Sequence, residues 1–276
     1  MTERKTLIPR KLHVEFDSAT PRRWFGGDGF RTHWLNAYSI LVPDGEKFIH
    51  RTVAAVSDQV SDPELKAQID GFSRQELSHA GQHQRAFRVL DRQGFRYRSV
   101  VAGFRWLNYS VVEPMVGRKL SLSVAAGIEH FNAMFAEVGL ENDDYFDGAD
   151  PALATLLRWH FAEEIEHKAV VHDVLADVAP GYVLRVFGGL LAFALFALDV
   201  ALVSCWLAVQ DGSLFRPSAW VSWFRYWFTR ERFAWRMLKG ALTYMRPGFH
   251  PNDHDNYHLV DRVATQGEPP ALTVAA

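Results

Sequence analysis

The stretch from His160 to His167 combines two imidazoles and a carboxylate at a spacing that suits metal binding. It lies in a run without glycine or proline, residues 153–178, which an Asp-Pro pair opens as helix N-cap and first helical residue. Because successive helical residues rotate by about 100°, His160, Glu164 and His167 fall within about 60° of one another. Apolar neighbours surround this stripe, which disfavours a solvated charged face. The pattern therefore indicates metal ligands that need partners from other helices.

Two further helical runs carry glutamates on apolar backgrounds. Residues 62–93 are expected to form a helix in which Glu76 and His79, three positions apart, share a face. Residues 114–138 are expected to form another, with Glu129 near its middle. A single ExxH motif is common by chance, so neither run identifies a metal site without the others.

A fourth run supplies a glutamate next to an expected bend. The helical pattern of residues 28–60 is interrupted at residues 43–45, because proline removes a backbone donor and bends a helix. Glu46 follows the bend in line with apolar residues at helical spacing, which indicates an inward-facing ligand. Taken alone, Glu46 could equally be a first-turn glutamate that the helix dipole stabilises.

In chain order the four runs give Glu, ExxH, Glu and ExxH, which is the ligand order of a ferritin-like di-metal bundle. Carboxylates bridge and neutralise the cations of such a site, while imidazoles favour iron or manganese over calcium. We therefore predict an all-α, ferritin-like four-helix bundle with additional hydrophobic C-terminal helices. We predict two metal ions in its core, iron first, with manganese or a mixed manganese–iron pair as alternatives. The predicted ligands are Glu46, Glu76, His79, Glu129, His160, Glu164 and His167.

Four sequence motifs resemble a known bacterial family. They are Pro-Asp-Gly-Glu46, Gln-Glu76-x-x-His79-x-x-x-His83, Trp159-His160-x-x-Glu-Glu164-x-Glu-His167-Lys168 and Tyr244-Met-Arg-Pro-Gly-Phe-His-Pro251. These motifs look like the family described as predicted metal-dependent hydrolases, over about residues 25–255. That resemblance implies hydrolysis with the help of metal. The ligand pattern also resembles the di-iron arylamine N-oxygenases, which use four glutamates and three histidines, and this second resemblance implies that His160 is the third histidine ligand.

Some groups close to the predicted ligands are assigned other roles. His83 lies one turn beyond His79 and is expected to orient a ligand, with direct ligation as the alternative. Glu163 points about 60° to one side of His160, so we expect it to support the ligands or to lie at the surface. His130 faces away from the ligand stripe of its helix and is expected to be structural.

Length and composition fit a cytoplasmic globular protein. The 276 residues are 48% hydrophobic and 22% charged, and the net charge of −2 gives no reason to expect nucleic acid as a partner. The single cysteine excludes an internal disulfide, and the basic N-terminus lacks the apolar core of a secretory signal. The expected parts are an arm (1–27), the di-metal bundle (28–180), hydrophobic and aromatic helices (181–250) and a tail (251–276).

The C-terminal third is more apolar than the rest of the chain. Residues 186–209 contain one charge, Asp199, and are long enough to cross a bilayer. Residues 220–236 interleave tryptophan and other aromatics with arginine, a composition typical of a membrane interface. We expect attachment to a membrane surface without a full span, because a carboxylate is costly in lipid. The alternative is a helix buried across the bundle or in a homodimer interface.

Three functional classes are compatible with these observations. In the first, a di-iron centre takes electrons from a donor, reduces O₂ and oxidises an apolar small molecule. In the second, two metal ions activate water for hydrolysis. In the third, the protein stores or carries metal. A closed, histidine-rich ligand set disfavours storage and suits iron and dioxygen. We therefore expect an O₂-dependent oxidase or oxygenase first and a metal-dependent hydrolase second.

Overall fold

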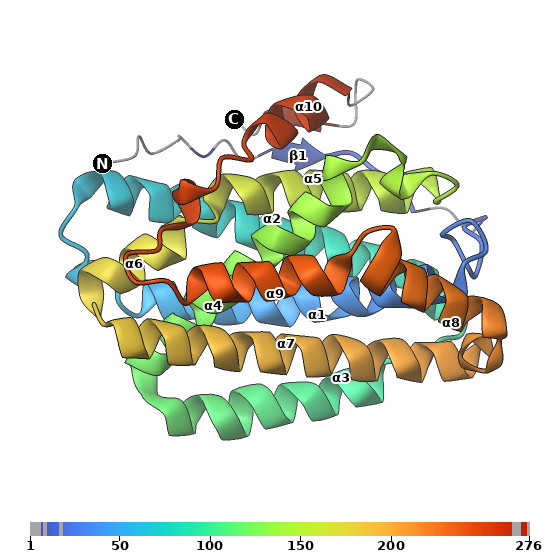
Figure 1. The fold of residues 1–276 in the computed structure, drawn as a ribbon, viewed down its shortest axis with the longest axis horizontal. Coiled ribbons are helices and arrows are strands. Elements are labelled where there is room, and N and C mark those ends of the chain that lie inside the picture. The colour runs from blue at the N-terminus through green and yellow to red at the C-terminus, as the bar shows by residue number, and fades with distance from the viewer. Residues whose placement is uncertain (1–6, 8–9, 17–18, 267–271, 275–276) are drawn as a thin grey trace.

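The computed structural model describes residues 7, 10–16, 19–266 and 272–274, so parts of the expected arm (1–27) and tail (251–276) lie outside it. Nearly all of the described chain is helical, which confirms the predicted all-α bundle (Figure 1). The short strands β1 (Arg10–Leu12) and β2 (Leu272–Val274) pair antiparallel. The α-helices are α1 (Gly29–Ala54), α2 (Pro63–Arg92), α3 (Arg98–Arg105), α4 (Glu113–Glu141), α5 (Pro151–His167), α6 (Val170–Val178), α7 (Tyr182–Gln210), α8 (Pro217–Phe224), α9 (Phe233–Tyr244) and α10 (His258–Gln266). The π-helix η2 (Trp106–Val112) joins α3 to α4, and the π-helix η5 (Arg225–Thr229) follows α8.

The helices that carry the predicted ligands, α1, α2, α4 and α5, pack together as the core of the molecule. Three of them begin at an aspartate N-cap whose carboxylate accepts backbone N–H groups of the first turn, namely Asp28, Asp62 and Asp150. Proline follows the second and third caps at the first helical position, where its missing N–H costs nothing. These caps fix where each helix starts and so the level at which its ligands stand in the bundle.

The long apolar helix α7 packs on α4 and α1. Glycines permit the close approach of α7 and α4, because a Cβ at Gly127 would stand 2.7 Å from the Cα of Gly189. A Cβ at Gly188 would likewise collide with the side chain of Ser123. Among the described helices α7 is the one long and apolar enough to cross a membrane, yet 28% of its most apolar window is buried against the bundle. The hydrophobic C-terminal helices therefore cover the bundle, as expected, and leave one side of α7 exposed.

Two helices are longer or more continuous than the sequence pattern predicts. The interruption expected at residues 43–45 is wrong, because α1 runs through Pro43 and ends at Ala54. One lost backbone hydrogen bond does not outweigh the packing of α1 against α2 and α7. The helix end expected at Gly139 is also wrong, since α4 continues to Glu141. This glycine serves packing, because a Cβ there would stand 2.4 Å from Cε2 of Phe161.

The run of residues 153–178, expected to be one helix, is divided into α5 and α6. The break falls at Lys168, directly after the last predicted ligand. The Lys168 ammonium group donates hydrogen bonds to the carbonyl oxygen of His254 and to Oδ1 of Asn256. Contacts with a distant part of the chain therefore hold this turn, and no local glycine or proline predicts it.

Candidate metal centre

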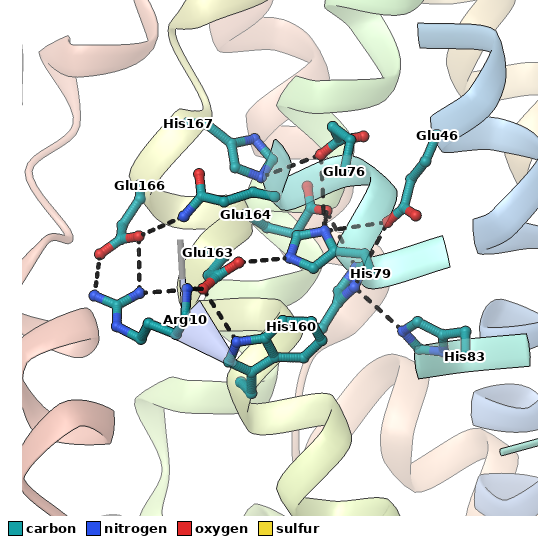
Figure 2. A network of polar contacts seen from close by, with 12 residues as sticks. Arg10, Glu46, Glu76, His79, His83, His160, Glu163, Glu164, Glu166 and His167 are labelled. Carbon is teal, nitrogen blue, oxygen red and sulfur yellow. Dashed lines mark hydrogen bonds and ion pairs between the residues drawn. The ribbon is translucent and has the colours of Figure 1, made fainter. Parts of the chain in front are cut away.

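The seven predicted ligands come together in the four-helix core. Figure 2 labels all of them except Glu129. All of them are buried, with no more than 2% of any residue exposed. Their donor atoms form two overlapping groups, and within each group all donors lie within 4.8 Å of one another. One group is Glu46, His79, His160 and Glu164, and the other is Glu76, His79, Glu164 and His167. Glu129 stands just outside the second group and contacts it through His167.

His79 stands where the two groups meet. Its Nδ1 lies 3.2 Å from Glu46 Oε1, 3.7 Å from Glu76 Oε1 and 3.9 Å from Glu164 Oε1. Its other ring nitrogen, Nε2, lies 3.0 Å from Glu163 Oε2. A carboxylate behind a metal-binding histidine fixes the ring and its tautomer. With Glu163 as acceptor, Nε2 carries the proton and Nδ1 turns its lone pair to the centre.

Glu163 is fully buried and is held in place from two sides. Its Oε1 accepts hydrogen bonds from Trp159 Nε1 at 3.0 Å and from the backbone N–H of Arg10 in β1 at 3.2 Å. Burial raises the pKa of Glu163 to about 7, against the lowering effect of the Arg10 guanidinium. Of the two expectations for Glu163, a position at the surface is wrong. Its contacts are those of a residue that orients His79.

His160 is enclosed by polar partners on both ring nitrogens. Its Nε2 lies 3.1 Å from Glu164 Oε1 and 2.7 Å from the Tyr38 hydroxyl. Its Nδ1 lies 3.2 Å from His83 Nε2 and 3.7 Å from Glu46 Oε1. His83 belongs to neither of the two ligand groups found among the described residues. His83 therefore lies beside the His160 ring, and its orienting role stays a prediction.

His167 links Glu76 to Glu129. Its Nε2 lies 3.3 Å from Glu76 Oε1, and its Nδ1 lies 2.8 Å from Glu129 Oε2. With Nδ1 donating to Glu129, Nε2 offers its lone pair to the second ligand group. The other oxygen of Glu129, Oε1, is buried and has no hydrogen-bond partner. Glu129 can therefore orient His167 through one oxygen and bind a cation through the other.

The four glutamates at the centre share one desolvated site. Burial, and then repulsion between these carboxylates, raises the pKa values of Glu46, Glu76 and Glu129 well above the usual range. Burial also raises the pKa of Glu164, although the neighbouring histidines and a hydrogen bond from Asn132 act in the opposite direction. Carboxylates in such surroundings need protons or cations to offset their charge.

Burial has the opposite effect on the imidazoles. It lowers the pKa values of His160 and His167, and it lowers the pKa of His79 to about 3. These rings are therefore neutral near pH 7, which is the form that binds metal. Both carboxylate oxygens of Glu46 and of Glu76 are buried without a hydrogen-bond partner. Because buried polar atoms are almost always paired, this donor set fits two metal ions better than it fits the protein alone.

Two polar residues at the centre, Tyr38 and Asn132, were not among the predicted site residues. Tyr38 is 1% exposed, and burial raises the pKa of its phenol well above the usual value. Asn132 follows Glu129 by three positions, so helical spacing could have placed it on the same face. Tyr38 precedes Glu46 by eight residues, a spacing too loose to single it out.

A cavity of about 100 Å³ ends at the centre. Its polar wall includes Tyr38, Glu46 and Asn132, and Asp199 lines it from α7. Burial raises the pKa of Asp199 to about 7, so this carboxyl is largely neutral in mildly acidic solution. The rest of the wall is mainly apolar and comes from α1, α3, η2, α4 and α7: Leu41, Val42, Phe48, Ile49, Phe104, Val124, Ile128, Leu191, Leu195 and Phe196. The cavity suits an apolar molecule with one polar group.

The motif at residues 244–251 lies outside the two ligand groups. His250 Nε2 donates to Asp173 Oδ1 of α6 at 2.8 Å, and His250 Nδ1 accepts the backbone N–H of Asn252. His172, Asp173 and His250 offer a third, smaller set of donor atoms. His250 and Asp173 are partly exposed, unlike the fully buried central groups, and they are hydrogen-bonded to each other, so we assign the motif to fastening the segment after α9 onto α6.

Replacing His160 by alanine is expected to reduce bound metal by about half and to change the absorption of any iron centre, because His160 contributes to one of the two ligand groups. Metal analysis and absorption spectroscopy of the purified variant measure both effects. His130→Ala is the matched control, since His130 is also buried but its Nε2 contacts the carbonyl oxygen of Gly240. Full metal content and an unchanged spectrum in His160→Ala would make His160 a core histidine.

Comparison with known proteins bears on the same residues. The comparison with curated proteins found no match, and neither did the comparison with solved structures. The resemblance of the ligand pattern to the arylamine N-oxygenases therefore stays a prediction. A family model described as "Predicted metal-dependent hydrolase" matches residues 8–255, which include every predicted ligand. The chain therefore belongs to the family of predicted metal-dependent hydrolases.

Proposed function

We propose that this protein is a metal-dependent hydrolase that cleaves an apolar small molecule at a polar bond such as an ester. The observation that carries the proposal is a buried set of metal-binding donors, several without protein partners, at the end of an apolar cavity. The family description supports hydrolysis over oxidation. The O₂-dependent reaction that the ligand pattern led us to expect is therefore the second candidate.

The two ligand groups would each hold one ion. Glu164 could serve both ions through its two oxygens, whereas His79, with one free lone pair on Nδ1, would serve one of them. When bound there, two divalent cations would lower the pKa of water and polarise a carbonyl group. The chain's own groups supply orientation and proton handling. Glu163 accepts a hydrogen bond from Nε2 of His79 and so keeps the ring proton there. Glu129 likewise keeps the ring proton of His167 on Nδ1.

The cavity wall supports a division of the substrate into two parts. Tyr38, Glu46 and Asn132 would meet the polar bond, and the apolar wall would take a hydrocarbon chain. In ester cleavage the oxygen of water adds to the carbonyl carbon, the carbon–oxygen bond to the alcohol breaks, and the alcohol leaves with a proton. Tyr38 keeps its phenolic proton because burial raises its pKa, so its hydroxyl can donate to the oxygen that gains negative charge.

A chain-length series of p-nitrophenyl esters tests this function. Protein purified without added metal is stripped with a chelator and then loaded separately with zinc, manganese or ferrous iron. We expect hydrolysis only in loaded protein, and faster hydrolysis of esters with longer acyl chains. Loaded protein that takes up metal at the two groups but cleaves none of the esters, nor the matching amides, would contradict hydrolysis of this substrate class.

Narrowing the cavity should alter chain-length preference without altering metal content. Leu195 lines the cavity, so Leu195→Trp is expected to slow hydrolysis of long esters about tenfold more than hydrolysis of the acetate. Leu198→Trp is the matched control, because Leu198 lies on the same helix and is 54% exposed. Rates for the ester series and metal analysis of both variants measure the effect. Equal losses for short and long esters in Leu195→Trp would show that the chain binds elsewhere.

Oxidation with O₂ is the second candidate because of the donor set itself. Four glutamates and three histidines, all buried, are hard and borderline ligands that suit iron. The discriminating measurement is oxygen uptake by the ferrous protein in the presence of an apolar molecule and a chemical reductant. Uptake that depends on the apolar molecule, together with no ester hydrolysis, would support this candidate over the first.

A further inference from the structure

Exposed apolar side chains are concentrated on one part of the molecule. Among the described residues every large hydrophobic side chain that is exposed lies in residues 106–115 or 182–242, except Leu77. We call residues 96–120 and 182–246 the apolar face; they comprise α3, η2, the start of α4, α7, α8, η5 and α9. In Figure 1 helices α3, α7 and α9 lie side by side, and the contacts between them agree. Exposed apolar area on this scale marks an interaction surface.

Helix α7 presents two different sides. Its buried side includes Gly188, Gly189 and Leu207 and packs on the bundle. Its other side carries a stripe of exposed residues at helical spacing: Val183, Phe187, Leu190, Leu198, Leu202, Trp206 and Val209. A helix with one apolar side packed on protein and the other apolar side exposed is suited to rest on a lipid surface.

The exposed charges of the apolar face have one sign. Its residues include thirteen lysines and arginines and four aspartates and glutamates. Eleven of the cations are exposed, whereas all four carboxylates (Glu113, Asp199, Asp211 and Glu231) are buried or half-buried. Arg98, Arg105 and Arg230 are paired with Asp91, Asp44 and Asp144 of neighbouring segments, which leaves eight exposed cations on a chain whose net charge is −2. A second copy docked on the same face would bring like charges together, while an anionic lipid surface would complement them.

We propose that the apolar face rests on an anionic lipid bilayer, with the apolar side chains at the acyl boundary and the exposed cations among the headgroups. The occupant is lipid because apolar area and uniformly positive exposed charge occur together on one face. The metal centre stays on the water side, since α1, α2, α4 and α5 carry it beneath α7. α7 lies along the membrane and does not cross it.

The apolar face contributes part of the cavity wall. The cavity is lined by Phe104 and Tyr109 from α3 and η2, and by Leu191 and Leu195 from α7, all within the apolar face. Asp199, the one charge of the apolar run, lines the cavity, which removes the cost of exposing it to lipid. If the proposed function holds, the substrate therefore enters from the bilayer and is lipid-soluble.

An open groove of about 620 Å³ adjoins the cavity and refines the substrate class. The two share Tyr109, Glu113 and Ser121 as lining residues. The groove contains four cations and two carboxylates. Arg105 is paired with Asp44 and Arg51 with Glu113, so Lys47 and Arg118 are the cations that could bind a carboxylate or phosphate group. A lipid with an acyl chain and an anionic headgroup fits this pair of spaces.

The single cysteine allows a direct test. Cys205 is exposed on the lipid-facing side of α7, and an environment-sensitive fluorophore on it reports whether that side enters lipid. With vesicles of phosphatidylcholine and phosphatidylglycerol, we expect a blue-shifted emission and quenching by lipids spin-labelled on the acyl chain. With phosphatidylcholine alone we expect at least about tenfold weaker binding. The control label is placed at exposed Gln84 of α2, through Gln84→Cys in a Cys205→Ser background, and should not respond.

Matched variants separate lipid contact from misfolding. Leu202→Glu with Leu242→Glu, both at exposed positions of the apolar face, should lower vesicle binding at least tenfold, and Arg225→Glu with Lys239→Glu should do the same. Leu77→Glu, at an exposed leucine of α2, should leave vesicle binding unchanged. An unresponsive label, or equal loss of binding in Leu77→Glu, would overturn the proposal.

The oligomeric state distinguishes lipid from the alternative occupant of the apolar face, a second copy of the chain. A stable dimer in sedimentation, with the Cys205 label shielded in the absence of lipid, would make the apolar face a subunit interface and overturn membrane docking. Failure of docking and failure of the hydrolase function are distinguishable, because vesicle binding needs no metal. Glu164→Ala protein should therefore bind vesicles as well as the unaltered protein does.

Discussion

Glu164→Ala is expected to leave the protein folded but to remove nearly all bound metal and all metal-dependent activity. Glu164 is the only carboxylate that belongs to both ligand groups of the described residues, so its loss affects both ions at once. Glu76 and Glu46 each belong to one group, and their replacement should leave part of the metal bound. Metal analysis after loading, with competition by a chelator of known affinity, measures the loss.

The metal-free form of the same variant should be at least as stable as the metal-free unaltered protein. Burial raises the pKa of Glu164 and of its carboxylate neighbours, which means that their shared site destabilises the charged forms. Removing one acid lowers that cost, although a small cavity offsets part of the gain. Glu166→Ala is the control, because Glu166 lies two residues on and bonds to Arg10. Retention of both ions in Glu164→Ala would refute the shared-ligand geometry.

The ligand set could be predicted from sequence because each part of it is local. Spacing of three or four residues puts Glu76 beside His79 and Glu164 beside His167, and aspartate caps fix the starts of those helices. The helices then need only pack in the usual way for a bundle. Glu46 shows the limit of this reasoning, because it was chosen partly for an expected interruption of the helix that α1 does not have.

What could not be predicted depends on contacts between distant residues. Arg10 meets Glu163 across 153 positions, so its backbone N–H could not be identified as part of the support for His79. Lys168 ends α5 through bonds to residues 86 and 88 positions away, which hides the break from any local pattern. Gly139 was mistaken for a helix end because the sequence alone does not distinguish a glycine that permits close packing from one that caps a helix. The role of such residues is set by the partner, which only the fold supplies.

The exposed apolar helix shows a third kind of limit. Residues 186–209 are equally consistent, by composition, with a buried helix and a membrane helix. The fold divides the run into a side on the bundle and a side that is exposed, and it turns Asp199 into the cavity. The sequence does not indicate which side of α7 is buried and which is exposed, because both sides have similar hydrophobicity. Small residues, such as Gly188 and Gly189, mark the packed side only once α4 is known to lie there.

Removal of metal is expected to make the stability of the protein fall as pH rises through the neutral and mildly alkaline range. The pKa values of Glu46, Glu76 and Glu129 lie well above 4.5 in the folded protein. The metal-free folded state therefore keeps protons that the unfolded chain has released, and the free energy of unfolding decreases with pH. Each carboxyl that keeps its proton contributes a fall of about 1.4 kcal/mol per pH unit.

The histidines have the opposite effect on the pH dependence of stability, but only at acidic pH. Burial lowers the pKa values of His79 and His160 below 6.5, so the folded state binds fewer protons than the unfolded chain below about that pH, and neither binds any above it. Glu163 and Asp199, with pKa values raised to about 7, add to the fall only up to about neutral pH. A fall in the free energy of unfolding that continues above about pH 7.5 is therefore due to the glutamates of the centre.

Thermal unfolding of metal-free and metal-loaded protein from about pH 7.5 to about pH 9 provides the measurement. A loss of about 1.4 kcal/mol for a chain of this length lowers the melting temperature by roughly 3–6 °C per pH unit. Bound cations hold the same carboxylates in their charged form at every pH of the series, so the loaded protein should show little change. Glu129→Gln should reduce the slope of the metal-free protein, because it removes one titrating group, whereas Glu166→Gln should not. Equal slopes with and without metal would mean that these glutamates keep no protons and that the centre is not built around cations.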